Sequence, residues 1–288
     1  MKQEDLRATA LKYLKFWSCI SVGEPYFTSS SLLWPATRLG ENVILKIVDP
    51  LDDEAHSATA LEFFEGHGAV MVRESTQNIL LLERILQAED SSLEQMVLSG
   101  RDDEATRIIC EVTEKLHSAS ETKAAPPEAI PFLQRTSSLR SAHEERQVDL
   151  RDRSIFRLAN EVLEDLLQQS SGSEIFLHGD IHHFNILKSS DRGWLAIDPK
   201  GIRGPKIYDY ANTLCNPYMH ESVVANSSRM ERQSYFISEF ANVDRDLLIQ
   251  FTFLHAMIAA SWNLNEPDLP YWLACARTAA ELGSLKVD

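Results

Sequence analysis

The chain has 288 residues, of which 44 % are hydrophobic, and carries a formal net charge of −15 at pH 7. A chain of this length is long enough for one large domain or for two lobes around a cleft. The negative charge argues against a nucleic-acid partner and against an anionic membrane surface, since both repel acidic proteins, and it favours a cationic ligand.

Cysteine usage and the N-terminal segment indicate the compartment. The four cysteines are far apart and form no C-x-x-C pair, which is typical of free thiols under reducing conditions. The first residues, MKQEDLRATALKYL, mix charges at helical spacing and lack the long apolar core of a signal peptide. No window holds the roughly 18 apolar residues that a membrane span needs. We therefore expect a cytoplasmic protein with no membrane association; the sequence does not indicate its oligomeric state.

Strand patterns dominate the first 86 residues. β-branched and aromatic residues alternate with turn residues there, and the strand NVILKIV is closed by Asp49-Pro50. In chain order we predict an amphipathic helix at 4–17, strands within 21–48, a helix at 52–66, and strands at 69–74 and 78–86. This is a β-rich segment with one helix among its strands.

Helical patterns dominate from Ser91 onward. SSLEQMVL opens with a serine cap and an early glutamate, and the acidic start of DDEATRIICEVTEKLHSAS suits a helix N-terminus. We predict a linker at 120–131, helix over 136–170 and most of 229–286, and strands with a loop within 174–198. The chain is therefore expected to be an α+β protein of two lobes, a small β-rich one at 1–86 and a larger, mostly helical one at 87–288.

Residues 178–198 carry the strongest chemical pattern. Asp180 and Asn185 share the segment HGDIHHFN, and Asp198 follows the apolar strand WLAI. Phosphoryl transfer from ATP needs a carboxylate near the attacking hydroxyl, with amide and carboxylate oxygens on Mg²⁺. An isolated H-G-D is common in turns, but the spacing H-x-D-x-x-x-x-N, followed by a hairpin-like segment, matches a kinase catalytic loop. We predict a small-molecule kinase with Asp180 as catalytic base and Asn185 and Asp198 as Mg²⁺ ligands.

A kinase cleft also needs a cation for the ATP phosphates. Lys46 is the candidate, because it stands alone in the otherwise apolar strand VILKIV. An edge-strand lysine that discourages aggregation would be expected in a more polar strand. A buried ammonium needs an anionic partner, for which we choose Glu54 in the following helix, with Glu62 second.

Two further segments are candidates for nucleotide binding. The turn at 26–31 lacks G-x-G-x-x-G, but Ser30 can bring a backbone N–H and a hydroxyl to phosphate; a plain serine-rich turn explains it equally well. The backbone from Glu83 to Ile85, where the first lobe ends, can pair with the adenine edge.

The histidines of the same loop invite a different interpretation. His178, His182 and His183 with Asp180 could form a metallohydrolase site. Gly179 breaks any helix that would align the first two, and only Asp198 is available as a further ligand. We expect His178 to brace the loop instead.

The segments HGDIHHFNIL, WLAIDPKGIRGPKIYDYANTLCNP, GHGAV and LLLERIL resemble the aminoglycoside/hydroxyurea antibiotic-resistance kinases, the streptomycin 6-phosphotransferase-like branch of the aminoglycoside phosphotransferases. The resemblance implies a bilobal protein-kinase-like fold, ATP–Mg²⁺-dependent O-phosphorylation, and the roles given above, with Asp209 as a structural residue. One departure is Gly204-Pro205, where members often have Gly-Asp-Pro. This change lies near the substrate side.

The resemblance and the charge favour a cationic small-molecule acceptor, an aminoglycoside such as streptomycin. Carboxylates would surround it, with Glu221, Glu266 and Asp268 as candidates in the helical region. The same machinery would serve a kinase of a non-antibiotic metabolite such as an amino sugar. An inactive kinase-like binding protein is a third hypothesis, against which the presence of all four catalytic residue types argues.

Overall fold

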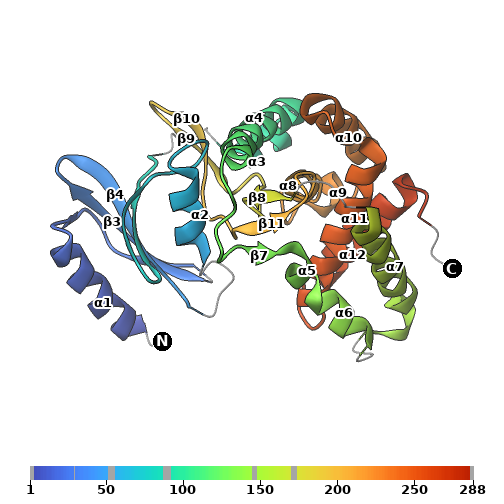
Figure 1. The fold of residues 1–288 in the computed structure, drawn as a ribbon, viewed down its shortest axis with the longest axis horizontal. Coiled ribbons are helices and arrows are strands. Elements are labelled where there is room, and N and C mark those ends of the chain that lie inside the picture. Colours follow the sequence, from blue (N-terminus) through green and yellow to red (C-terminus); the bar gives the residue numbers. More distant parts are fainter. Residues whose placement is uncertain are drawn as a thin grey trace.

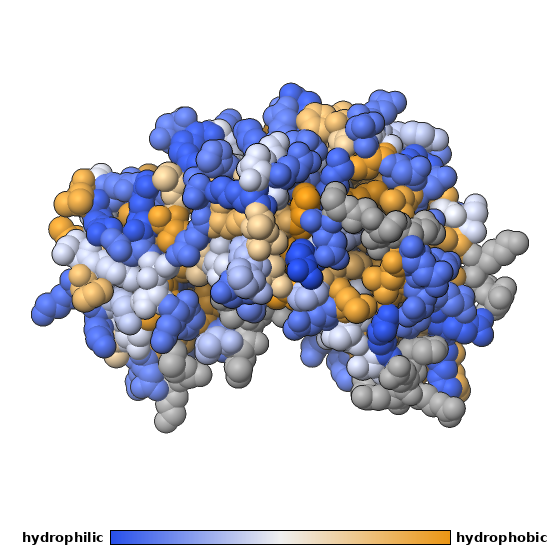
Figure 2. All heavy atoms as spheres, in the orientation of Figure 1, coloured by the Kyte–Doolittle hydropathy of each residue, from blue (hydrophilic) through white to orange (hydrophobic). Residues whose placement is uncertain are grey.

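The computed structural model describes residues 3–28, 30–50, 56–86, 92–144, 148–169 and 174–285. Figure 1 shows two lobes side by side, a smaller one built on a β-sheet and a larger one of packed helices. Figure 2 shows hydrophilic side chains over most of the same face, broken by scattered apolar patches. No helix in the described part of the chain is long and apolar enough to cross a membrane.

The smaller lobe is an antiparallel sheet with one helix on each face. Its strand order is β1-β3-β4-β6-β5, with β2 paired to β3. The elements are α1 (Gln3–Phe16), β1 (Ile20–Ser21), β2 (Tyr26–Phe27), β3 (Ser31–Arg38), β4 (Glu41–Val48), α2 (Ser57–Phe64), β5 (Val72–Thr76) and β6 (Ile79–Glu83). The helix predicted among the strands is α2, and α1 covers the opposite face (Figure 1).

Strand β4 decides where Lys46 points. Side chains alternate between the two faces of a strand. Leu45 and Ile47 pack in the apolar cluster beneath α1, whereas Ile44 and Val48 pack in the cluster shared with α2 and the larger lobe. Lys46 therefore lies on the face that looks toward the larger lobe.

The larger lobe is organised around α11, which is buried over most of its length between Leu248 and Ser261, as expected of a central helix. A small sheet, β7-β11-β8, and the hairpin β9–β10 lie beside the smaller lobe. The helices are α3 (Leu93–Leu98), α4 (Asp102–Glu121), α5 (Phe132–Arg135), α6 (Ser137–Glu144), α7 (Arg153–Gln169), α8 (Tyr208–Leu214), α9 (Glu221–Val224), α10 (Ser227–Ala241), α11 (Arg245–Trp262) and α12 (Leu269–Leu282). The strands are β7 (Ile130–Pro131), β8 (Ile175–Leu177), β9 (Ile186–Ser189), β10 (Gly193–Ala196) and β11 (Ile202–Gly204).

Most predicted elements are confirmed, and two segments differ. The continuous helix expected over 136–170 is interrupted: α6 ends at Glu144, and a 3₁₀ turn (Leu150–Asp152) precedes α7. Val148 is buried there and Asp149 is extended, so the chain leaves the helical path to place an apolar side chain in the core. The expected linker contains the short strand β7. The predicted lobe boundary at 86/87 falls between β6 and α3, beside residues 87–91, which lie outside the described part.

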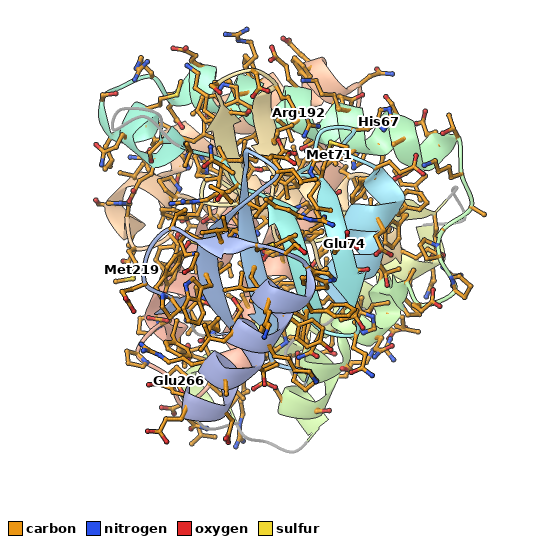
Figure 3. The ribbon with its side chains drawn as sticks, turned by 90° about the vertical axis from the view of Figure 1, so that its left-hand side faces the viewer. His67, Met71, Glu74, Arg192, Met219 and Glu266 are labelled. Atoms are coloured by element: carbon orange, nitrogen blue, oxygen red, sulfur yellow. The ribbon has the colours of Figure 1, made fainter. Side chains whose placement is uncertain are left out.

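The hairpin β9–β10 joins the lobes. Val70 N–H donates to the carbonyl of Ala196, 3.0 Å away, and Ala196 N–H donates to the carbonyl of Gly68, 2.7 Å away. Gly68 has φ +77°, and an added Cβ would lie 2.9 Å from Lys115 Cβ, so this close approach requires glycine. Arg192, at the hairpin turn, forms an ion pair with Glu83; Figure 3 shows it beside His67 and Met71.

Candidate active site

The loop between β8 and β9 is fixed by its backbone. Gly179 has φ +81°, and an added Cβ would lie 2.6 Å from Ile202 Cδ1, so glycine is required at this position. The N–H groups of His178 and Gly179 donate to the carboxylate of Asp209, at 3.1 and 2.7 Å. Asp209 is buried on α8, so it holds the loop against the core of the larger lobe. This is the structural role that the resemblance implied for Asp209.

His178 braces the loop, as expected. Its Nε2 donates to the carbonyl of Ile197 at 2.9 Å, and its Nδ1 accepts from the N–H of Asp180 at 3.2 Å. Both ring nitrogens are thereby used, and burial lowers the pKa of His178, which keeps the ring neutral. Over the described ranges, no group of three or more His, Cys, Asp or Glu side chains is placed to hold a metal ion. The metallohydrolase interpretation therefore gains no support from this loop.

Asp180 lies at the centre of a set of donors. Asn212 Nδ2 donates to its Oδ1 at 2.9 Å, and Asn185 Nδ2 donates to its Oδ2 at 3.3 Å. The ring of His182 and the ammonium of Lys200 lie 3.8 and 4.0 Å from the carboxylate. Burial alone would raise the pKa of Asp180, but the neighbouring positive charges hold it below its usual value. The carboxylate is therefore ionised and can accept a hydrogen bond from a hydroxyl.

Lys46 and Asp198 form an ion pair, and the backbone of Asn185 is bonded next to Asp198. Lys46 Nζ lies 2.7 Å from Asp198 Oδ1, and its side chain is almost fully buried. The carbonyl of Asn185 accepts from the N–H of Ile197, directly before Asp198, at 2.9 Å. Asp198 has φ +57°, a strained conformation for a residue other than glycine that often marks a functional site.

This donor set fits a hard cation. Asn185 donates through its amide nitrogen to Asp180, which leaves the amide oxygen as a metal ligand. Asp198 uses Oδ1 for Lys46 and carries a second carboxylate oxygen. Carboxylate and amide oxygens are the ligands that Mg²⁺ takes from proteins.

The described residues include an anionic partner of Lys46 that we did not predict. The described partner is Asp198, 152 positions further along the chain. Glu54 lies outside the described residues, so its assignment stays a prediction. Glu62 is exposed and accepts a hydrogen bond from Ser75.

The remaining nucleotide candidates lie at the edges of the smaller lobe. Ser30 N–H donates to the hydroxyl of Thr28 at 3.3 Å, so this donor is used within the turn. This contact is also what the alternative, a plain serine-rich turn, predicts. Glu83 bonds through its carboxylate to Arg192 and to the N–H of Met71, and its own N–H is used by the carbonyl of Met71. Ile85 follows this bonded stretch.

A pocket of about 450 Å³ opens at Asp180. It is lined by Arg135, Asp180, His182, Phe184, Lys200, Asn212, Asn216, Tyr218, His255, Ala259, Trp262, Asn263, Asp268 and Trp272. Two larger hollows in the larger lobe, of about 760 and 710 Å³, are lined by other residues, none of them in this group. The chemistry, and not the size, therefore selects the pocket at Asp180.

The far wall of this pocket is aromatic and carries one carboxylate. The rings of Tyr218 and Trp272 are stacked with centroids 5.8 Å apart. Burial and a hydrogen bond to Asp268 raise the pKa of Tyr218 to about 12. The sequence did not reveal this wall, because its residues come from separate helices and loops. Asn212 could have been noticed within the quoted YDYANTL segment.

Two lobes joined beside a loop of this geometry define a phosphotransferase of the protein-kinase-like class. The chain belongs to the aminoglycoside/hydroxyurea antibiotic resistance kinase family, which matches residues 16–266. It is 30 % identical over 263 residues to streptomycin 3''-kinase of Klebsiella pneumoniae, covering 87 % of this chain and 90 % of that protein. Identity to streptomycin 6-kinase of Streptomyces glaucescens is 23 % over 273 residues, covering 91 % and 84 %.

Solved structures show the same fold at low identity. A thermostable mutant of the aminoglycoside phosphotransferase APH(4)-Ia, solved with AMP-PNP and hygromycin B, has a TM-score of 0.65 at 10 % identity, covering 96 % of this chain and 98 % of that one. Choline kinase LicA from Streptococcus pneumoniae has a TM-score of 0.63 at 14 % identity, covering 98 % and 99 %. The predicted family and fold are confirmed, and the chain is a small-molecule kinase.

Proposed function

We propose that this kinase transfers the γ-phosphoryl group of ATP to a hydroxyl of an aminoglycoside-type acceptor, with streptomycin as the first candidate. One observation supports the proposal: the carboxylate of Asp180 faces a pocket on one side and is bonded to Asn185 on the other. The carbonyl of Asn185 is bonded to the residue before Asp198, and Asp198 forms an ion pair with Lys46. Three streptomycin kinases among the relatives support the acceptor class.

Asp180 is the group that receives the acceptor. Its ionised carboxylate accepts a hydrogen bond from the attacking hydroxyl and directs the oxygen toward the γ-phosphorus. Because the transition state of phosphoryl transfer is largely loose, this orientation contributes more than proton abstraction. Lys200, 4.0 Å from Asp180, places a positive charge beside the transferred group.

Lys46, Asn185 and Asp198 form the nucleotide side. Lys46 contributes its ammonium to the phosphates, and Asn185 and Asp198 would hold Mg²⁺ through their oxygens. When bound, Mg²⁺ would neutralise charge on the phosphate oxygens. We assign Glu54 as a further partner of Lys46, Ser30 to the phosphate-covering turn, and the backbone between Glu83 and Ile85 to the adenine edge.

Asp268 is the candidate carboxylate that lies in the acceptor pocket, where it would bind a cationic group of the acceptor. Glu221 and Glu266, the other candidates, are exposed and are not among the lining residues. Figure 3 shows Glu266 at the lower left, below Met219. The pocket also contains Arg135 and Lys200. Because these two cations partly offset the carboxylates, an amino sugar with a single ammonium group is the second candidate.

A screen of acceptors tests the proposal. ADP release from Mg²⁺–ATP is measured with streptomycin, other aminoglycosides, hydroxyurea and simple amino sugars, with the Asp180→Asn variant as blank. We expect turnover of streptomycin and a product heavier by one phosphoryl group on a hydroxyl. Phosphorylation of a neutral or anionic metabolite alone would refute the aminoglycoside assignment and leave the kinase assignment intact.

A further inference from the structure

A chain of amide hydrogen bonds runs from the wall of the acceptor pocket to Asp180. Tyr218 N–H donates to Asn216 Oδ1 at 3.0 Å. Asn216 Nδ2 donates to Asn212 Oδ1 at 2.8 Å. Asn212 Nδ2 then donates to Asp180 Oδ1 at 2.9 Å. Three residues of the pocket lining are thereby connected in series to the carboxylate.

The direction of every hydrogen bond in this series follows from groups that can only donate or can only accept. A backbone N–H can only donate, so the atom of Asn216 that meets Tyr218 N–H is its oxygen. Asn216 Nδ2 also donates to the backbone carbonyl of Asn212 at 3.0 Å, and a carbonyl can only accept. The amide of Asn216 is therefore fixed at both ends. It presents N–H to Asn212, whose oxygen must accept and whose nitrogen must face Asp180.

The chain is anchored in the core of the larger lobe. Asn212 and Asn216 are buried, and the carbonyl of Asn216 accepts from Arg229 Nη2 at 3.0 Å. Arg229 is held in turn by two 2.9 Å bonds to the buried carboxylate of Asp102. On α8, Asn212 lies three residues after Asp209, a spacing that places both on one face of the helix. This face holds the catalytic loop twice, by its backbone and by the side chain of Asp180.

We propose that Asn212 is a positioning residue for Asp180, and that Asn216 fixes the amide of Asn212 so that it can only donate to the carboxylate. The proposal rests on the function assigned to Asp180 above. Asn185 holds Oδ2 and Asn212 holds Oδ1, so the carboxylate plane is set by one bond at each oxygen. A single remaining bond at Oδ2 would let the carboxylate rotate away from the acceptor hydroxyl. A misplacement of about 1 Å is enough to lower turnover by about 10²-fold.

Kinetics of Asn212→Ala, Asp180→Asn and the double variant test this role. Asn212→Ala should lower kcat by roughly 10- to 100-fold and leave KM for ATP within about twofold. In the Asp180→Asn background the same substitution should change kcat by less than about twofold, because its effect passes through Asp180. Thr213→Ala is the matched control, since Thr213 is a buried neighbour on α8; its kcat should stay within about twofold of the parent.

Wild-type kcat in Asn212→Ala would overturn the proposal, as would an equal loss in both backgrounds, which indicates a general disturbance of the lobe. If Asp180→Asn itself keeps full turnover, the proposed function fails instead. The crystal structure of Asn212→Ala then decides the positioning separately: a rotated Asp180 carboxylate supports it, and an unchanged orientation refutes it.

Discussion

The proposed nucleotide side and the proposed acceptor side meet at Asp180 and are built in different ways. Lys46, Asn185 and Asp198 come from one strand and one short segment, and all three carry charged or amide groups. The acceptor side is assembled from α5, α8, α11, α12 and the connections between them, and it mixes aromatic rings with charges of both signs. The first side is defined by residue type, the second by the packing of distant elements.

Chemistry explains the difference. Phosphates and Mg²⁺ require hard oxygen ligands and a cation at fixed separations, which a short loop and one strand can supply. An acceptor molecule is held by shape, and many combinations of side chains give a similar shape. Variants that disturb one side alone should therefore leave binding at the other intact.

Asp180→Asn is expected to have the largest effect, because both sides converge on this carboxylate. We expect kcat to fall by about 10²- to 10⁴-fold, while affinity for Mg²⁺–ATP changes by less than about twofold. Steady-state kinetics and calorimetry measure the two quantities. A variant that retains near-wild-type kcat would show that the two sides do not meet at this residue.

Asp198→Asn tests the nucleotide side by itself. The shape is retained, but an anionic ligand is lost, so we expect the Mg²⁺-dependent gain in ATP affinity to fall by roughly 100-fold. Acceptor affinity should not change. Calorimetry with ATP, in the presence and absence of Mg²⁺, is the measurement. If the metal-dependent gain persists, Asp198 serves only as the ionic partner of Lys46.

His255→Gln tests how the acceptor side responds to acid. His255 lines the pocket, and burial lowers its pKa from 6.5 to about 4. The unfolded chain binds the proton first as pH falls, so stability is retained above about pH 6.5 and is lost between 6.5 and 4. At pH 5 this loss is about 2 kcal/mol, and the glutamine variant should not show it.

Urea unfolding at pH 7 and pH 5 measures the free energy of unfolding of the wild type and of His255→Gln. His67→Gln, the same substitution at an exposed histidine outside the pocket, is the matched control. An unchanged dependence in His255→Gln would mean that other groups cause the acid sensitivity.

Asp268→Asn is expected to have the smallest effect and to be confined to the acceptor side. Removing the negative charge should raise KM for a cationic acceptor about tenfold with kcat unchanged. This pattern is expected because the contact binds the acceptor equally well in the ground state and in the transition state. The KM of the wild type should rise with ionic strength, since salt screens the attraction. Glu266→Gln, outside the pocket, is the control. Equal KM values in all three proteins would exclude Asp268 from acceptor binding.

The two sides also differ in how much of each could be predicted from the sequence, and the reason is the same. Asp180, Asn185 and the β9–β10 hairpin are close in sequence, so local spacing and alternation were enough to predict them. The pairing of Lys46 with Asp198 spans 152 positions, so no local pattern near Lys46 could indicate it. Tyr218 and Trp272 come together only after α8 and α12 have packed, and no local pattern reports such a contact.

The junction of Ala196 and Ile197 joins the two lobes next to Asp198. Ala196 is bonded to the smaller lobe, at Gly68 and Val70, and Ile197 is bonded to His178 and Asn185 in the larger one. Adjacent residues are thus attached to opposite lobes, so both lobes restrain the chain at this peptide. We expect the carboxylate of Asp198, one residue away, to stay almost still during substrate entry and product release.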